Sequence, residues 1–366
     1  MKNRKNKKIR LAILFGGKSA EHEVSIQSAR NITEAIDNEK YEVSFIGITK
    51  TGKWQLLDLP KLKKGKTSVI VEKKKNAVAL IPQGNGELTN QANIPKIQFD
   101  VVFPILHGPF GEDGTVQGLL KLANVPFVGA SVLGSAIGMD KDVMKRLLKE
   151  ANIPVAKFIS YHSYQKTQIR FEKIISELGL PFFVKPANLG SSVGISKIHD
   201  PKEFHSAVNK AFKYDRKILF EENIIGREIE CSVIGNENPV ASVPGEVIPQ
   251  HEFYSYEAKY TDENGAVLKI PAELSLSTQK SIQEMAVKVF KVLECEGMAR
   301  VDFFLKDNGH IVVNEINTIP GFTSISMYPK LWEQSGIPYA KLIDILIKLA
   351  IDRFKQEQKL KTSFVI

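Results

Sequence analysis

Four polar residues in two neighbouring apolar segments carry the clearest chemistry in the sequence. Arg300 and Asp302 lie in the first segment, and Glu315 and Asn317 lie in the second. The residues of each pair are two positions apart, so in a β-strand both side chains project from the same face. Carboxylate and amide oxygens around one point suit a hard cation, and Mg²⁺ combines a few carboxylates with water and substrate phosphates. The alternative is that these are ordinary polar residues on the exposed face of an amphipathic sheet.

A β-hairpin is the element that must position these residues. Both segments, 300–305 and 310–317, are rich in β-branched and aromatic residues, and Asn308-Gly309 lies between them. An Asn-Gly pair favours positive φ, so the pattern predicts a tight turn that brings the polar faces of the two strands together. Because apolar residues alternate with the acids, the cation site is favoured over the exposed-face alternative.

Two further apolar segments end in loops rich in glycine. Residues 9–15 run into Gly16-Gly17 and a helical pattern that extends to Ile36, and residues 99–106 run into a loop that begins at His107. Units of strand, turn and helix place ligands at the carboxyl ends of parallel strands. The first turn lacks the GxGxxG spacing, which makes dinucleotide binding a weak prediction. His107 either contacts a substrate here or caps and packs its loop.

A third loop combines a lysine with glycines and serines. Lys185 lies near the end of the apolar segment 180–186, and the loop 187–195 contains two glycines together with Ser191 and Ser192. Backbone N–H groups and small hydroxyls suit phosphate oxygens, and a lysine on a strand supplies a fixed cation. The spacing is not that of a Walker A loop, so a flexible hairpin is the alternative.

An acidic pair lies where the next predicted strand leaves this region. Residues 218–225 predict a strand that contains Glu221 and Glu222, and an alternating segment, 226–233, follows it. At such a junction an adenine can pair with backbone while nearby carboxylates bind its amino group and the ribose hydroxyls. Salt-bridged surface glutamates are the alternative, and chemistry alone does not separate Glu221 from Glu222.

The remaining segments supply a framework for these motifs. A helix is predicted from Ser131 to Glu150, with Lys141 in its middle, and helical patterns also cover 277–293 and 339–354. The polar and aromatic segment 250–262 has no period and is a candidate lid. The Lys-rich stretch 60–96 predicts a short hairpin or excursion on the surface of the first domain.

Composition limits the class of protein. The chain has 366 residues, of which 43% are hydrophobic, enough for two or three domains with buried cores. The formal charge is +9, but five basic residues fall within the first eight positions, which predict a disordered tail. A second lysine cluster, 61–75, lacks the aromatic interleaving of a single-strand binding surface. Anionic substrates explain the remaining basicity, and we expect no nucleic-acid partner.

Cysteine usage and the N-terminal segment indicate a reduced, cytoplasmic protein. Cys231 and Cys295 are far apart and belong to no CxxC or Cys/His pattern. The apolar segment 9–15 is too short, and too soon interrupted by glycine, for a signal or membrane helix. We therefore expect no membrane among the partners.

Several of these motifs, in this order and over nearly the whole chain after residue 8, resemble those of the D-alanine–D-alanine ligases of the ATP-grasp superfamily. The motifs are Gly16-Gly17-x-Ser19-x-Glu21-His22-Glu23-Val24-Ser25, His107-Gly108-x-x-Gly111-Glu112-Asp113-Gly114, Met139-Asp140-Lys141, Val184-Lys185-Pro186 with Gly190-Ser191-Ser192-Val193-Gly194, and Arg300-x-Asp302 with Glu315-x-Asn317-Thr318-x-Pro320-Gly321.

The resemblance implies an α/β chain of the α+β ATP-grasp type. After a basic tail, 1–8, it implies an N-terminal domain with a doubly wound parallel sheet, 9–138. Two ATP-grasp subdomains would follow, 139–228 and 229–366, and the second would carry the metal site and the lid loop. ATP would lie between these two subdomains, and the amino acids between the first domain and the last.

The resemblance also assigns roles residue by residue. ATP binding is implied for Lys141, Lys185, Ser191, Ser192, Glu221, Glu222, Ile224, Glu228 and Lys259. Two Mg²⁺ or Mn²⁺ ions are implied at Asp302, Glu315 and Asn317. Substrate contacts are implied for Glu21, His107, Arg300, Gly321, Ser326 and Met327, and catalytic roles for Glu21, Ser191, Tyr260, Arg300 and Ser326. Glu222 departs from the Lys or Gln of some members, and Met327 from a common Leu.

The implied activity is ATP-dependent ligation of two D-alanines through an acyl phosphate, by a cytoplasmic homodimer, for peptidoglycan precursors. The nearest alternatives are a ligase with D-lactate or D-serine as acceptor and another ATP-grasp carboxylate-amine ligase. A biotin-dependent carboxylase subunit shares the ATP-grasp parts but has no need for Glu21 and Ser326. A non-catalytic nucleotide-binding or nucleic-acid-binding protein would lack some of Arg300, Asp302, Glu315 and Asn317, and none is missing.

Overall fold

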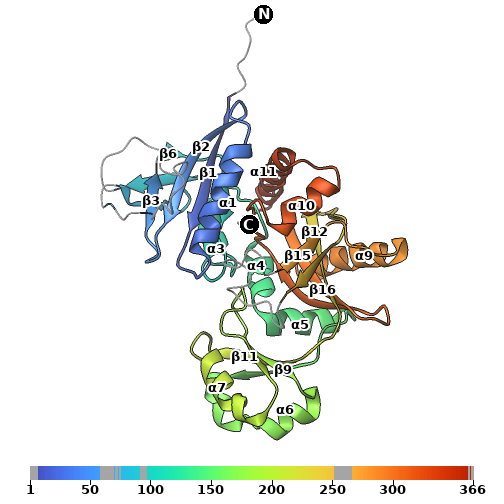
Figure 1. Cartoon of the computed structure of the whole chain (residues 1–366). Helices are drawn as coiled ribbons and strands as arrows, with labels where there is room; N and C mark the ends of the chain where they lie inside the picture. Colours follow the sequence, from blue (N-terminus) through green and yellow to red (C-terminus); the bar gives the residue numbers. More distant parts are fainter. Residues whose placement is uncertain are drawn as a thin grey trace, which may run out of the picture.

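The computed structural model describes residues 7–57, 70, 73, 76–90, 97–250, 266–361 and 363, and in this part the chain is a mixed α/β structure. Its strands form four sheets. Figure 1 shows the N-terminal sheet in blue, a green and yellow unit at the opposite end, and an orange and red unit beside them. Most of the predicted basic tail, residues 1–6, lies outside the described residues.

The N-terminal sheet is built on parallel strands, as predicted. Its elements are β1 (Ile9–Gly16), α1 (His22–Ala35), β2 (Tyr41–Ile48), β3 (Trp54–Leu57), β7 (Val101–Ile105) and α3 (Thr115–Leu122). β1 pairs in parallel with β2 and β7, and β3 is an antiparallel edge strand. Leu11 and Ile13 pack toward α1, whereas Ala12 and Leu14 pack toward α3. Both faces are thus covered, as a parallel sheet requires.

Part of the Lys-rich stretch forms a small separate sheet. Its strands, β4 (Val78–Leu80), β5 (Glu87–Asn90) and β6 (Ile97–Gln98), pair antiparallel in that order. The described residues of the predicted excursion therefore form a three-stranded meander, and β4 contacts β3 of the N-terminal sheet. The most lysine-rich segments of this stretch lie outside the described residues.

The central sheet is antiparallel and is backed by two helices. In chain order the elements are β8 (Phe158–His162), the 3₁₀ helix η2 (Ser163–Gln168), α6 (Phe171–Leu178), β9 (Phe182–Pro186), β10 (Ser196–Ile198), α7 (Pro201–Ala211) and β11 (Lys217–Glu222). The strand order is β10-β9-β11-β8. Phe182 and Phe220 from the sheet meet Phe204 of α7 with ring centroids 5.7 to 6.2 Å apart. These rings form the centre of this core.

The C-terminal sheet lies between helices on its two faces. Its elements are β12 (Arg227–Gly235), β13 (Val240–Ala241), β14 (Gly245–Pro249), β15 (Ala266–Lys269), α9 (Leu276–Val292), β16 (Gly297–Leu305), β17 (Ile311–Asn317), α10 (Met327–Gln334) and α11 (Tyr339–Glu357). Cys231 and Val301 pack toward α9. Ile234 and Met298 share a core with α10, α11 and the N-terminal sheet. The C-terminal helix therefore joins the first part of the chain to the last.

The predicted hairpin is confirmed, but its turn differs from the prediction. Lys306 and His310 close the turn, and within it Gly309 donates to the carbonyl of Lys306 over 2.8 Å. Only Gly309 of the Asn-Gly pair has positive φ, at 80°. Asn308 instead accepts the backbone N–H of His310 through its side chain. This is a turn followed by a left-handed glycine, a common three-residue hairpin loop.

The prediction of one helix over 131–150 is wrong. The segment forms two helices, α4 (Val132–Met139) and α5 (Lys141–Glu150), and Asp140 between them is extended, with ψ at 97°. The Asp140 carboxylate accepts hydrogen bonds from the backbone of Asp142 and Val143, both at 3.1 Å. An aspartate in this position is a strong N-cap, and it begins a new helix within an otherwise continuous apolar pattern.

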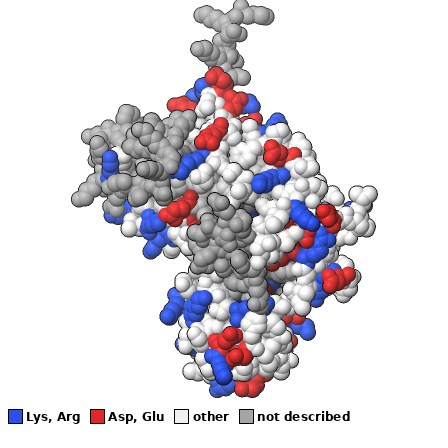
Figure 2. Space-filling view, in the orientation of Figure 1, with Lys and Arg blue, Asp and Glu red and all other residues white. Residues whose placement is uncertain are grey.

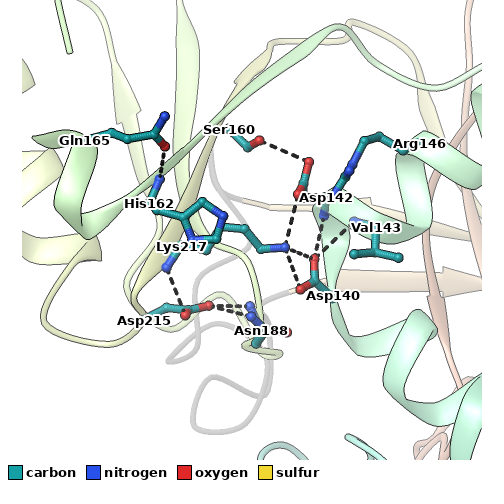
Figure 3. Close-up of polar contacts among 10 residues, drawn as sticks. All are labelled: Asp140, Asp142, Val143, Arg146, Ser160, His162, Gln165, Asn188, Asp215 and Lys217. Atoms are coloured by element: carbon teal, nitrogen blue, oxygen red, sulfur yellow. Dashed lines mark hydrogen bonds and ion pairs between the residues drawn. The ribbon is translucent and has the colours of Figure 1, made fainter. Parts of the chain in front are cut away.

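Lys217 ties the start of α5 to the central sheet. Its Nζ lies 2.7 Å from Asp140 and 3.0 Å from Asp142, which also accepts hydrogen bonds from Ser160 and Arg146 (Figure 3). Burial raises the pKa of Asp142, but Lys217 and these donors outweigh burial and leave the pKa below its usual value. Because Lys141 directly follows Asp140, this cluster also fixes the position of the Lys141 backbone at the start of α5.

Two further features of the described residues are the charges on the surface and the apolar character of the helices. Figure 2 shows basic and acidic side chains intermixed over the described residues of one face. Among the residues that the structure describes, no helix has both the length and the apolar character needed to cross a bilayer.

We expect Lys217→Met to lower the free energy of unfolding by about 3–5 kcal/mol at pH 7, because the buried carboxylate of Asp142 and the partly exposed carboxylate of Asp140 lose their shared cation. The folded pKa of Asp142 lies below its ordinary value of 3.8, so its stabilising contribution is present above that pH and is lost at lower pH. The difference between variant and wild type should therefore shrink below pH 3.8. Urea denaturation across a pH series measures it. Exposed Lys213→Met is the control, and an equal loss in both variants would contradict the assignment.

We expect Phe204→Ala to destabilise the central core by about 3–5 kcal/mol, because it leaves a cavity among rings that cannot collapse together. Urea unfolding followed by circular dichroism measures the loss. Tyr164→Ala, in the same part of the chain and 77% exposed, should change the unfolding free energy by less than about 0.5 kcal/mol. Similar losses in the two variants would show that the cluster does not hold this core together.

Candidate active site

The hairpin brings the four predicted polar residues together. Asp302 lies opposite Glu315, and Arg300 lies opposite Asn317, in the register of β16 and β17. The residues between them, Val301 among them, are buried toward α9, so the polar side chains occupy the other face of the sheet. The predicted alternation is confirmed, and a bulge after Asp302 shifts the register beyond this point.

Arg300 is held by two carboxylates. Its Nε and Nη2 donate to the two oxygens of Asp302, each over 2.7 Å. Glu230, on β12, lies 2.9 Å from the same Nε. Burial lowers the pKa of Arg300, but Asp302 and Glu230 outweigh burial and raise it. The guanidinium is therefore a fixed cation with a set orientation.

Glu230 is a site residue that the sequence reasoning missed. It pairs directly with Asp302 across β12 and β16. The signal was present in the alternating strand, where Glu228 and Glu230 are two positions apart and hence share a face. Only the pairing of β12 with β16 shows that this face meets Arg300.

The hairpin residues suit a divalent cation. Oδ1 of Asn317 is buried and has no hydrogen-bond partner, which is costly for an acceptor unless a cation or water binds it. Asp302 and Glu315 supply carboxylates from the opposed positions beside it. In the described ranges no three His, Cys, Asp or Glu side chains form a ready metal cluster. Two carboxylates and one amide oxygen nevertheless match the ligand preference of Mg²⁺, which completes its shell with water and phosphate.

The central sheet buries Glu221 between two lysines. Lys185, on β9, donates to one of its oxygens, and Nζ of Lys145, on α5, lies 2.8 Å from the other. Burial raises the pKa of Glu221, but the two lysines outweigh burial and lower the pKa to about 2. Glu222 points elsewhere and accepts the backbone N–H of Lys157 over 2.7 Å. The strand thus separates two glutamates that the sequence alone did not.

Lys145 is a second residue that the sequence reasoning missed. It lies four positions after Lys141, so both project from one side of α5. Burial lowers the pKa of Lys145, and repulsion from Lys185 adds to this in spite of the attraction of Glu221. The pKa shifts of the two partners differ because Glu221 has two cations beside it, whereas for Lys145 the attraction of Glu221 and Glu315 is opposed by burial and by Lys185.

Lys141 connects the Gly and Ser loop to the hairpin. Its Nζ donates to the carbonyl of Leu189 over 2.8 Å and lies 3.4 Å from Oε2 of Glu315. Three elements distant in the sequence therefore meet at one ammonium group. α5 supplies the lysine, the loop after β9 supplies the carbonyl, and β17 supplies the carboxylate.

The Gly and Ser loop also reaches the N-terminal part of the chain. Ser191 donates a short hydrogen bond to Glu21, which is the N-cap residue of α1. Ser191 and Ser192 both have positive φ, 52° and 59°, a conformation that costs non-glycine residues energy and is found mainly at ligand sites. The strands on either side of this loop, β9 and β10, pair antiparallel as a hairpin, and the loop between them lies against Glu21.

Three of the residues predicted near the amino-acid substrates, Gly321, Ser326 and Met327, follow β17 of the C-terminal sheet. Ser326 is the N-cap of α10, and its Oγ accepts the backbone N–H of Thr323 over 2.9 Å. A Cβ on Gly321 would come within 2.7 Å of that Oγ, so the loop requires glycine here. Met327 is buried beside Val247.

His107 packs against the same loop. Its Nδ1 lies 3.0 Å from the carbonyl of Ile319, and its Nε2 is buried without a hydrogen-bond partner. Burial lowers the pKa of His107, but Glu112 and Glu21 outweigh burial and raise it. The loop-packing role is therefore observed, and contact with a substrate stays a prediction.

The remaining predicted residues divide into two groups. Ile224 follows β11 and Glu228 lies on β12, so both stand at the junction between the central and C-terminal sheets, and both are half-buried. Lys259 and Tyr260, with most of the candidate lid, lie outside the described residues.

Two family models match the chain. One, described as D-ala D-ala ligase N-terminus, matches residues 10–130, and the other, described as D-ala D-ala ligase C-terminus, matches residues 147–348. The D-alanine--D-alanine ligase of Oceanobacillus iheyensis is 55% identical over 97% of this chain and 99% of its own. D-alanine--D-alanine ligase A of Escherichia coli K12 is 47% identical over the same shares.

Solved structures agree with these relatives. The D-alanine-D-alanine ligase from Coxiella burnetii superposes with a TM-score of 0.86 at 41% identity, covering 96% of each chain. The VanG D-Ala:D-Ser ligase from Enterococcus faecalis superposes with a TM-score of 0.84 at 36% identity, covering 94% of this chain and all of its own. The predicted ATP-grasp fold is confirmed, and by both sequence and structure this chain belongs to the D-alanine–D-alanine ligase family.

Proposed function

We propose that this protein joins two D-alanines into D-alanyl-D-alanine and converts ATP to ADP and phosphate in the process. One observation carries the proposal. Lys141 lies between a loop suited to phosphates and a hairpin suited to a cation, 2.8 Å from Leu189 and 3.4 Å from Glu315. Groups that bind a nucleotide and groups that bind its metal are thus gathered beside Arg300, the cation suited to a developing oxyanion.

ATP occupies the space between the central and C-terminal sheets in this proposal. Glu221 binds the adenine amino group, with Glu222 and Ile224 beside the base, and Glu228 binds the ribose. The phosphates are held by Lys141, Lys185, Lys259 and the loop residues Ser191 and Ser192. The support is the left-handed backbone of that loop at Ser191 and Ser192. In addition, Lys145 and Lys185 both contact the carboxylate of Glu221.

Asp302, Glu315 and Asn317 hold Mg²⁺ or Mn²⁺, as two ions. When bound, such ions neutralise charge on the transferring phosphoryl group. The support is the orphaned amide oxygen of Asn317, beside the opposed positions of Asp302 and Glu315. Lys141, 3.4 Å from Glu315, adds a fixed positive charge next to this set.

The amino acids lie between the N-terminal and C-terminal parts. Glu21 binds the ammonium of the first D-alanine, while Ser326 and Met327 face the carboxylate end of the second. His107, Gly321 and Tyr260 complete this region. The support is the bond from Ser191 to Glu21, which brings the two substrate regions next to the phosphate loop.

The chemistry follows from the weakness of a carboxylate as an acylating group. The first D-alanine attacks the γ-phosphorus of ATP through a carboxylate oxygen, ADP leaves, and an acyl phosphate forms. The deprotonated amine of the second D-alanine then attacks the acyl carbon. Arg300, held by Asp302 and Glu230, stabilises the oxyanion of the tetrahedral species, which collapses with loss of phosphate.

The biological setting is proposed on the same ground. The dipeptide serves peptidoglycan precursors, and the enzyme works in the cytoplasm as a homodimer. It takes D-alanine and ATP and no nucleic acid or membrane. Its units are the tail 1–8, an N-terminal domain 9–138 and two ATP-grasp subdomains, 139–228 and 229–366. Each of these statements comes from the family resemblance and the fold.

A D-alanine–D-serine ligase is the second candidate. The likeness to the VanG ligase, at 36% identity over 94% of this chain, favours it as the alternative acceptor class. Phosphate release from ATP should be measured with D-alanine, L-alanine, D-serine and D-lactate. Of the four compounds, we expect D-alanine to be the one that causes phosphate release. We expect mass spectrometry to identify the product as a dipeptide. Faster release with D-alanine and D-serine together, with a mixed product, would favour the second candidate.

We expect Glu315→Gln to lower kcat about 10²–10³-fold, because the change removes a carboxylate from the proposed Mg²⁺ site, and the cation held there would neutralise phosphoryl charge. The melting temperature should stay within about 2 °C, since the amide keeps the side chain's shape at a position already polar. Steady-state kinetics with a Mg²⁺ series, beside thermal melting, measures both. Glu333→Gln, exposed on α10, is the matched control. Near-normal turnover at saturating Mg²⁺ would remove Glu315 from the proposed metal site.

A further inference from the structure

Lys145 is a buried lysine for which the proposed function has no role. It lies on α5, one turn beyond Lys141, and 1% of its side chain is exposed. Its Nζ is 2.8 Å from Oε2 of Glu221, without the alignment of a directed hydrogen bond, so the contact is an ion pair. Removal of an ammonium group from water is expensive, and hydrophobic residues in place of a whole buried ion pair are often at least as stable. The lysine therefore requires an explanation beyond stability.

Glu221 has a second cation, and the two are not equivalent. Lys185 bonds the other oxygen of Glu221, and its side chain is 11% exposed compared with 1% for Lys145. Lys185 lies on β9, just before the Gly and Ser loop that is proposed to bind the phosphates. Lys145, in contrast, is fully buried beside Glu221. Of the two, Lys185 is the lysine that can exchange Glu221 for a phosphate oxygen.

We infer that Lys145 is a positioning residue for the nucleotide, holding Glu221 ionised and in place from inside the protein when Lys185 turns to a phosphate. The inference rests on the proposed function, in which Glu221 meets the adenine. It adds a division of labour between two lysines that contact one carboxylate. Lys185 exchanges partners, and Lys145 does not.

An ionised Glu221 also selects among purines. A carboxylate accepts a hydrogen bond from the amino group of adenine but repels the carbonyl oxygen that replaces this group on the base of inosine. Burial alone raises the pKa of Glu221. Lys145 and Lys185 together lower this pKa to about 2, and Lys145 has the larger effect of the two. Without Lys145, the carboxylate takes up a proton when Lys185 turns to the phosphates. A protonated Glu221 weakens ATP binding and the preference for ATP over inosine triphosphate.

The test is calorimetric titration of ATP and of inosine triphosphate into the full-length protein. We expect Lys145→Met to weaken ATP binding about tenfold, the equivalent of one pKa unit, and to change inosine triphosphate binding less than about twofold. Lys149→Met, exposed one turn further along α5, should leave both affinities unchanged. An unaltered preference for ATP in Lys145→Met would overturn the inference.

A double-mutant cycle separates positioning from general structural support. If Lys145 acts through the charge of Glu221, Lys145→Met should change ATP affinity less than about twofold in a Glu221→Gln background. Equal losses in both backgrounds would overturn the inference. If Lys145→Met does not fold, Lys145→Gln replaces it, because the amide keeps polar N–H groups beside Glu221 while the charge is gone. A full preference for ATP in Lys145→Gln would likewise overturn it.

These outcomes are independent of the ligase reaction. Wild-type protein that binds ATP but releases no phosphate with D-alanine would contradict the proposed ligase activity. The calorimetric comparison would still decide the role of Lys145, because it measures nucleotide binding alone. Conversely, a normal ligase whose Lys145 variants keep their preference for ATP would contradict only the inference about Lys145.

Discussion

Burial of the Glu221 carboxylate is the constraint on which the arrangement around the site depends. An isolated charge in this position would be prohibitively costly, so the fold must bring cations to both oxygens. Lys185 comes from the neighbouring strand β9, and Lys145 comes from α5, which belongs to a different layer. A central sheet without α5 beside it would leave Glu221 with one partner. The helix and the sheet are thus coupled through a charge as well as through an apolar core.

The start of α5 is in turn set by electrostatics. Asp140 caps the helix and shares Lys217 with Asp142, so the first turn is anchored to β11, the strand that also carries Glu221. From this starting point, α5 places the side chain of Lys141 next to the Gly and Ser loop and the hairpin. One turn later it delivers Lys145 toward Glu221. A single capping residue therefore determines the reach of two lysines with different partners.

The rest of the architecture holds the substrate regions against this centre. The C-terminal helix α11 packs into one continuous core with the N-terminal sheet, and Tyr328 of α10 belongs to the same core. Ser191 bonds Glu21, so the phosphate loop meets the first helix of the chain. The apolar contacts fix the distance between the outer parts, and polar contacts such as those of Asp344 with Lys40 and Tyr41 add to them. Burial supplies the stability, and polar pairing supplies the geometry.

The sequence by itself determined the features that depend on local periodicity. Alternation placed Arg300, Asp302, Glu315 and Asn317 on one face of a hairpin, because side chains in a strand repeat every two residues. The buried strands of the parallel sheet were predicted from continuous apolar segments, and their turns from the glycines that follow these segments. Several motifs in order were enough to suggest the family.

Only the tertiary structure decided the features that depend on contacts between distant segments. The capping strength of Asp140 was outweighed in the sequence by a helical pattern on both sides, and Lys217, 77 residues away, completes the break. Glu221 and Glu222 have the same chemistry and are distinguished by which face of β11 meets α5. No sequence pattern singled out Lys145 and Glu230, and they are site residues because α5 brings Lys145 to Glu221 and β12 pairs with β16. No local pattern encodes such partners, since a buried charge is defined by the residue that neutralises it.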